Sequence, residues 1–98
     1  MKSRLTPRFW RLHDRLPRDI QRRARKAYQL WKADPSHPSL SFKQVGEEEP
    51  IYSARVDGGY RVVGLLEKDT MLWFWIGDHD EYERLLKHLY ARAATRYV

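Results

Sequence analysis

The stretch Tyr52–Arg61, with the sequence YSARVDGGYR, decides the fold of this chain. Two adjacent glycines separate two short runs of alternating apolar and polar residues, a pattern typical of a β-hairpin. A three-residue loop at 57–59 keeps the apolar residues of both strands on one face and places Arg55 opposite Arg61. We expect Gly59 to supply the left-handed backbone conformation of such a loop. Like charges opposite each other cost up to about 1 kcal/mol, and an anion bound between them removes that cost.

A second turn, at residues 67–70, joins the hairpin to a third strand. Counting back from this turn sets Val63 opposite Phe74 and Arg61 opposite Ile76. Apolar residues fall on both faces of the third strand, so we expect it to be central and covered on both sides. The two faces are Leu72, Phe74 and Ile76 on one side, and Met71, Trp73 and Trp75 on the other. The strands are expected at about 51–56, 60–66 and 71–76, with a weak strand before them at 40–45.

Two helices precede the sheet in this interpretation. Thr6 is a typical N-cap residue, Pro7 suits the first helical position, and this short helix ends before Pro17. Pro17 opens a longer helix that ends at Asp34, and the two helices are expected to pack as a hairpin. The longer helix has an apolar face and an opposite basic face. The apolar face contains Ile20, Ala24, Ala27, Tyr28 and Trp31, and the basic face contains Arg18, Arg22, Arg25 and Lys32.

A third helix follows the sheet. Asp78 and Glu81 form a capping box, in which each side chain bonds to the backbone N–H of the other residue. His79 then lies in the first helical turn, close to the arginine pair. Tyr82, one turn along, either supports His79 or packs into the core. The apolar face of this helix contains Tyr82, Leu85, Leu86, Leu89 and Ala93.

The composition indicates one folded domain, residues 1–98, with a polyanionic partner. Of the 98 residues, 42% are hydrophobic and 13% are aromatic, which is enough for one modest core. The formal net charge is +6, which favours nucleic acid as a partner. The absence of cysteine excludes disulfides and thiolate metal sites. There is no apolar signal-peptide core and no run near the ~20 apolar residues of a membrane span, so we expect a cytoplasmic protein with no membrane partner.

The chain resembles a known family in three features. The element order is helix–helix–strands–helix, the segment Tyr52–Val56 leads to Gly59-Tyr60-Arg61, and the third strand ends in Gly77-Asp78-His79. These features resemble the RelE/ParE superfamily, the toxins of bacterial type II toxin–antitoxin systems. The resemblance covers residues 16 to 90 and implies an α+β fold: a small twisted antiparallel sheet of three to four strands, two N-terminal helices packed on it and a C-terminal helix.

The resemblance also implies partners and an activity. A neutralising antitoxin is implied, usually encoded by the neighbouring gene. RelE-like members cleave mRNA on the ribosome, whereas ParE-like members inhibit DNA gyrase and lack the nuclease residues. The positions that match the nucleases are Arg55, Arg61, His79, Tyr82 and, in a weaker alignment, Lys43.

The sequence departs from the nuclease pattern at three places. Ser53 stands where the archetypal nuclease has a second lysine. A glutamate that matches the family's general base is not evident before Phe42. The usual first strand is poorly defined, because residues 2–5 are few and Pro7 follows at once.

These residues suit metal-free RNA cleavage without a cofactor, in which the ribose 2′-OH attacks the adjacent phosphate and expels the 5′-oxygen. Arg55 and Arg61 would hold the non-bridging oxygens and stabilise the charge that develops. His79 would donate a proton to the leaving oxygen, since an unperturbed histidine titrates near ~6.5. Tyr82 would orient the histidine or stack on a base. The general base is unassigned, with Lys43 as a candidate if its pKa were depressed.

Other interpretations stay open at this stage. Arg55 and Arg61 also fit exposed arginines on an open sheet face, paired with Glu67 or Asp80, and His79 fits an ordinary first-turn residue. The basic helix face, with Arg18, Arg22 and Arg25, would contact ribosomal RNA, an acidic antitoxin segment or solvent alone. Two other functions remain: a ParE-like gyrase inhibitor, and a non-catalytic toxin-fold protein that binds DNA only with its antitoxin.

Overall fold

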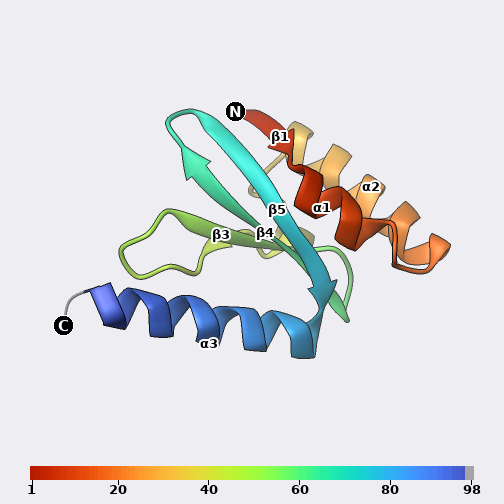
Figure 1. The fold of residues 1–98 in the computed structure, drawn as a ribbon. Coiled ribbons are helices and arrows are strands. Elements are labelled where there is room, and N and C mark those ends of the chain that lie inside the picture. The colour runs from red at the N-terminus through yellow and green to blue at the C-terminus, as the bar shows by residue number, and fades with distance from the viewer. Residues whose placement is uncertain (97–98) are drawn as a thin grey trace.

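A five-stranded mixed sheet carries helices on both faces in the computed structural model, which describes the backbone of residues 1–96 and the side chains of residues 1–91. The strand order is β1-β5-β4-β3-β2. Helices α1 and α2 cover one face and α3 covers the other (Figure 1). The elements are β1 Lys2–Leu5, α1 Pro7–His13, α2 Arg18–Ala33, the 3-10 turn η1 Pro38–Leu40, β2 Lys43–Gln44, β3 Ile51–Arg55, β4 Tyr60–Glu67, β5 Thr70–Asp78 and α3 His79–Arg96.

The α+β fold is confirmed, but the sheet is larger than expected and not purely antiparallel. Residues 2–5 form β1 despite their short length, and they pair in parallel with β5. Thr6 N–H also donates to the carbonyl of Trp73, so the chain stays bonded to β5 as far as the helix start. The weak strand expected at 40–45 shrinks to Lys43–Gln44, because the residues before it form η1.

The helix starts agree with the sequence interpretation, whereas α1 ends at His13, earlier than the expected break at Leu16-Pro17. Thr6 Oγ1 accepts a hydrogen bond from Phe9 N at the start of α1. Asp78 and Glu81 form the expected capping box, with N–H to carboxylate distances of 3.1 and 2.8 Å. Leu85, Leu86 and Leu89 pack under the sheet as expected, whereas the side chain of Ala93 lies outside the described residues.

The first hairpin has the expected register, with Ala54 opposite Val62 and Arg55 opposite Arg61. The mechanism of its turn differs from the expectation. No glycine in the described backbone has a positive φ, so Gly59 is not a left-handed residue. Instead, one carboxylate oxygen of Asp57 accepts hydrogen bonds from the N–H groups of Gly59, at 2.7 Å, and Tyr60, at 2.9 Å. The side chain of Asp57, and not a left-handed glycine, therefore closes this loop.

The second hairpin follows the expected register only as far as Gly64, which pairs with Trp73. A β-bulge comes next, and Val63 then lies opposite Trp75 and Arg61 opposite Gly77. The pairs Val63–Phe74 and Arg61–Ile76 expected from the sequence are therefore wrong by one residue. A side chain at position 64 would collide with the Trp73 ring at 2.7 Å, so the bulge coincides with close approach of the backbone to that ring.

The bulge also changes which residues share a face of β5. Trp73 and Ile76 both lie in the core under α1 and α2, together with Met71. Trp75 lies in the second core, under α3. The strict alternation expected for 71–76 is therefore wrong beyond Trp73. β5 is covered on both sides as expected, but it lies between β1 and β4, and β4 is the central strand. No described helix is long and apolar enough to cross a membrane.

Candidate functional site

Arg61 is the anchored residue of the candidate site. Its Nη2 donates to Ser53 Oγ at 2.9 Å and to the carbonyl of Ser41 at 3.3 Å. Its guanidinium lies over the ring of Tyr82, with Cζ 5.2 Å from the ring centroid. Nε is buried and has no hydrogen-bond partner among the described residues. Arg61 is therefore half-buried and held in one position, and the interpretation of an open sheet face is wrong for this side chain.

Tyr82 belongs to the core, which is one of the two places expected for it. Its side chain is 5% exposed and packs against the ring of Trp75. Its hydroxyl donates to Ser53 Oγ at 3.1 Å. The ring packs against the guanidinium of Arg61, and the hydroxyl is hydrogen-bonded to Ser53. Tyr82 is therefore buried and holds these two residues in position.

Ser53 is the residue of the site that sequence reasoning missed. Its side chain is fully buried, and its oxygen accepts from both Arg61 and Tyr82. The sequence showed only that a serine replaces a lysine. Its position between Arg61 and Tyr82 depends on the pairing of β3 with β4 and on the packing of α3 beneath both strands.

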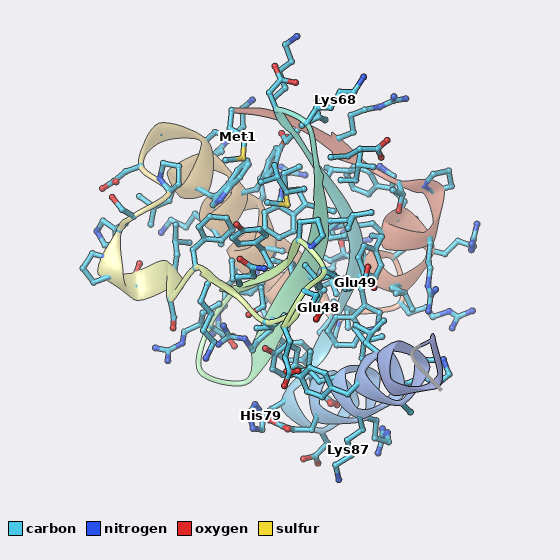
Figure 2. The ribbon with its side chains drawn as sticks, turned by 90° about the vertical axis from the view of Figure 1, so that its left-hand side faces the viewer. Met1, Glu48, Glu49, Lys68, His79 and Lys87 are labelled. Atoms are coloured by element: carbon cyan, nitrogen blue, oxygen red, sulfur yellow. The ribbon has the colours of Figure 1, made fainter. Side chains whose placement is uncertain are left out.

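His79 is an exposed residue of the site. It begins α3 as expected, and its side chain is 63% exposed (Figure 2). Its Nε2 lies 3.5 Å from a carboxylate oxygen of Glu83, and its ring lies 6.2 Å from that of Tyr82. The backbone N–H of His79 donates to the carbonyl of Gly59 at 3.0 Å, which ties the start of α3 to the loop of the first hairpin.

Arg55 and Lys43 complete a basic surface beside Arg61. Lys43 pairs with Ser53 across β2 and β3, and Arg55 pairs with Arg61 across β3 and β4. Paired residues share a face of a sheet, as do residues two apart on a strand, so both side chains lie on the α3 face with Arg61. Both are exposed. The structure thus brings together two exposed cations, one anchored arginine and one exposed histidine.

The other expected RNA-binding residues are not part of this group. Arg18, Arg22 and Arg25 lie on α2, on the opposite face of the sheet. They line an open concavity of about 530 Å³ together with Asp14 and Gln21.

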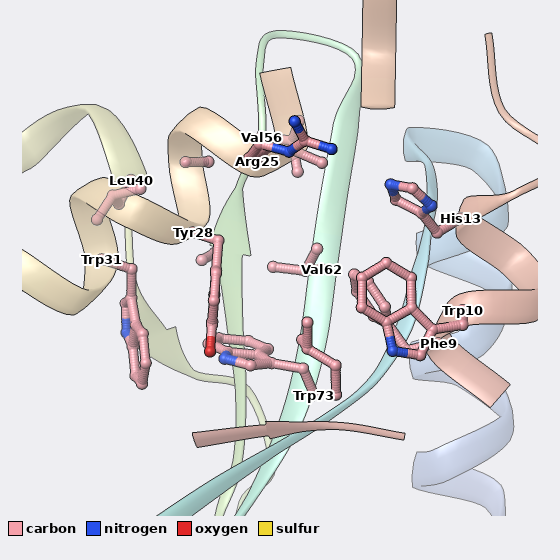
Figure 3. A pocket seen from close by; sticks show the side chains of 14 residues that line it. Phe9, Trp10, His13, Arg25, Tyr28, Trp31, Leu40, Val56, Val62 and Trp73 are labelled. Carbon is pink, nitrogen blue, oxygen red and sulfur yellow. The ribbon is translucent and has the colours of Figure 1, made fainter. Parts of the chain in front are cut away.

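An apolar groove lies on the same side, between α1, α2 and the sheet. Its volume is about 230 Å³. Figure 3 shows Arg25 and His13 at the same end of this groove, away from Trp73. Trp10 lines it and is 44% exposed. The two N-terminal helices therefore share a face of the sheet and leave an open apolar surface between them.

The carboxyl group of Asp57, in the loop beside the site, has a perturbed pKa. Burial alone raises the pKa of its carboxyl, but hydrogen bonds from Arg23 and from the N–H groups of Gly59 and Tyr60 outweigh burial and lower the pKa below its ordinary value. The same hydrogen bond raises the pKa of Arg23. This carboxylate therefore stays ionised well below neutral pH.

The chemistry available to the described residues is electrostatic stabilisation and proton transfer. No group of three His, Cys, Asp or Glu side chains in the described part of the chain is placed to hold a metal ion. Arg55 and Lys43 offer charge to an anion, Arg61 offers a fixed guanidinium edge, and His79 offers an exposed imidazole.

Both the sequence and the fold of this chain are similar to those of known proteins. The family model for the ParE-like toxin domain matches residues 18–84. No curated protein matches the chain. Solved structures with a similar fold include the RelB–RelE antitoxin–toxin complex from Methanococcus jannaschii, at 16% identity and a TM-score of 0.66, covering 83% of this chain and 95% of that one.

Two further structures show the same fold. YafQ from E. coli has 8% identity and a TM-score of 0.67, with 83% of this chain and 96% of that chain covered. The toxin–antitoxin complex RelBE2 from Mycobacterium tuberculosis has 22% identity and a TM-score of 0.57, with 80% and 96% covered. At these identities the likeness concerns the fold.

Proposed function

This chain belongs to the family of ParE-like toxin domains, and we propose that it is the toxin of a type II toxin–antitoxin system that cleaves mRNA on the ribosome. The observation that carries this proposal is the placement of Arg55, Arg61 and His79 at one end of the sheet. Arg61 pairs with Arg55 on one side and with Gly77, two residues before His79, on the other. Two arginines and a histidine are thus close together in the strand register at this end of the sheet.

The proposed reaction assigns each residue a role. The ribose 2′-OH attacks the adjacent phosphorus, the bond to the 5′-oxygen breaks, and a cyclic phosphate forms. Arg55 and the guanidinium edge of Arg61 bind the non-bridging oxygens, where negative charge grows in the transition state. His79 protonates the 5′-oxygen as it leaves. Lys43 binds a neighbouring phosphate or accepts the 2′-OH proton, and Tyr82 keeps Arg61 in position.

Expression in bacteria tests this function directly. The wild-type protein, His79→Ala and the control His88→Ala, an exposed histidine on the same helix, are induced in parallel, and mRNA 5′ ends are mapped by primer extension. We expect growth arrest with new 5′ ends inside translated messages for wild type and His88→Ala, and neither for His79→Ala. Arrest with intact mRNA, equal in all three proteins, would refute the nuclease.

Inhibition of DNA gyrase is the second candidate, favoured by the ParE-like family model. It requires none of the site residues, so the arrest would survive both His79→Ala and Arg55→Ala. Inhibition of supercoiling by purified gyrase, unchanged in both variants, is the result that would establish it. Expression of the wild-type protein without any arrest would leave the non-catalytic alternative.

We also propose an antitoxin as partner and place one of its segments in the apolar groove. The groove has an apolar lining, with Arg25 and His13 at one end, on a protein of net charge +6. An amphipathic segment with acidic residues beside its apolar face complements both features. Trp10→Ala should abolish rescue of growth by the neighbouring gene's product, whereas the exposed α1 variant Arg8→Ala should not.

Arg18 and Arg22 lie on the far side of the sheet from the cleavage site. We propose ribosomal RNA as the polyanion that they contact, since a protein bound in the ribosome is surrounded by phosphates on several faces. This contact is separate from the contact with the cleaved strand.

A further inference from the structure

An ion pair connects α2 to the loop of the first hairpin, beside the candidate site. Arg23 of α2 donates from Nη1 to Asp57 Oδ2 at 2.8 Å. The other carboxylate oxygen of Asp57 accepts from the N–H groups of Gly59 and Tyr60. One oxygen therefore holds the loop of the first hairpin in shape, and the other fastens that loop to the helix layer.

Apart from Asp57, backbone hydrogen bonds at its ends hold the loop: the carbonyl of Tyr60 accepts from the N–H groups of Val56 and Asp57. Neither glycine of the loop adopts a left-handed conformation, and no atom lies within 4 Å of where a side chain at Gly58 would stand. Two consecutive glycines lose much conformational freedom on ordering. The hydrogen bonds of Asp57 are the side-chain contacts that offset this cost.

The same loop holds two residues of the candidate site. The carbonyl of Gly59 accepts from the N–H of His79 at 3.0 Å, so it fixes the first turn of α3. Tyr60 is the residue before Arg61, and its carbonyl accepts from the N–H of Val56 at 2.9 Å. A shift of the loop therefore moves the start of α3 and the start of β4 relative to each other.

We propose that Asp57, held by Arg23, is a positioning residue for RNA cleavage: the pair sets the distance between His79 and Arg61. This inference rests on the proposed function. Asp57 acts through the backbone of Gly59 and Tyr60 and touches no substrate. Its side chain is 21% exposed and that of Arg23 is 55% exposed, so the pair lies at the surface where α2 meets the loop.

Two substitutions remove the ion pair from opposite ends. Asp57→Asn keeps a side-chain oxygen for the loop N–H groups and loses the charge that Arg23 binds. Arg23→Gln leaves Asp57 intact and removes its partner. Asp19→Asn is the matched control, because it removes the second carboxylate near Arg23, at 4.0 Å, without touching the loop.

Two measurements are made on each protein. The first is amide hydrogen exchange by NMR at His79 and Tyr60, with Val63 in the middle of β4 as the reference for global opening. The second is the single-turnover rate of cleavage of mRNA bound to purified ribosomes. We expect Asp57→Asn and Arg23→Gln each to speed exchange at His79 by a clearly larger factor than at Val63, and to slow cleavage by about tenfold. The double variant should equal either single variant, and Asp19→Asn should equal wild type.

The opposite results overturn the proposal. Exchange at His79 that is unchanged in both variants shows that the pair does not hold α3, and faster exchange with wild-type cleavage shows that the position does not matter for the reaction. Exchange that rises equally at Val63 reports general destabilisation and likewise refutes a positioning role. If the wild-type protein cleaves no RNA, the proposed function fails, and the exchange rates still decide whether Arg23 and Asp57 hold His79 in place.

Discussion

Tyr82 and Ser53 meet in the interior of the protein, where the tyrosine hydroxyl donates a hydrogen bond to the serine oxygen over 3.1 Å. The same oxygen accepts from Arg61 at 2.9 Å. One fully buried serine on β3 thus connects α3 to the arginine of β4. The candidate site is therefore built on a core contact, and the exposed cations Arg55 and Lys43 are arranged around it.

Ser53→Ala tests this connection. The substitution leaves Arg61 with only the carbonyl of Ser41 and leaves the Tyr82 hydroxyl without its acceptor, so we expect a loss of about 1–3 kcal/mol in the free energy of unfolding. Urea denaturation measures it. Ser41→Ala is the matched control, because Ser41 contacts Arg61 through its backbone carbonyl and should keep wild-type stability. Equal stability of both variants would show that Ser53 does not hold the site.

Tyr82→Phe separates the ring of Tyr82 from its hydroxyl. The ring still packs against Trp75 and under Arg61, so we expect a loss of about 1 kcal/mol and cleavage within a few-fold of wild type. Tyr82→Ala removes the ring and should cost about 3–5 kcal/mol. A Tyr82→Phe protein that folds normally but no longer cleaves would show instead that the hydroxyl takes part in the reaction.

Arg55→Gln and Lys43→Gln should weaken RNA binding without affecting stability, because both side chains are exposed. Each lost phosphate contact should reduce the slope of log affinity against log salt by about 0.7 for single-stranded RNA. Fluorescence anisotropy with a short labelled RNA measures the slope. Lys87→Gln, on the exposed side of α3, should leave it unchanged. A slope that falls equally in all three variants would indicate general attraction to a basic protein instead of a defined site.

Asp57→Asn should alter the acid sensitivity of the protein. The pKa of Asp57 is lowered by folding, so its ionised carboxylate stabilises the protein above the unfolded-state pKa of about 4, and this stabilisation is lost as the pH falls through the lower folded-state pKa. Wild type should therefore exceed Asp57→Asn in stability at neutral pH, and the difference should shrink toward about pH 3. Urea midpoints at the two pH values measure it. A difference that is constant or grows on acidification contradicts this linkage.

The sequence predicted those parts of the molecule that depend on local pattern. The register of the first hairpin follows from alternation around two glycines, and the capping box of α3 follows from the spacing of Asp78 and Glu81. The apolar spacing of the last helix likewise predicted the core as one of two places for Tyr82, and the side chain is buried there.

The predictions that were wrong or missing concern features that depend on contacts between segments distant in the sequence. The bulge after Gly64 is linked to packing of the Trp73 ring, which no local pattern reports. The parallel pairing of β1 with β5 joins the two most distant strands in the sequence. The sequence shows Ser53 only as a serine in place of a lysine. Its burial depends on contacts with both β4 and α3, which no local pattern indicates.

We propose that His79 and the arginine pair cleave RNA. The most direct measurement is the cleavage of a defined mRNA bound to purified ribosomes by wild type, His79→Ala, Arg55→Ala and the control His88→Ala. We predict a single set of cuts with wild type and His88→Ala, and rates lowered by about 10²–10⁴-fold in the His79 variant, with a marked loss in the Arg55 variant as well. Intact mRNA with the wild-type protein, or equal rates in all four proteins, would contradict it.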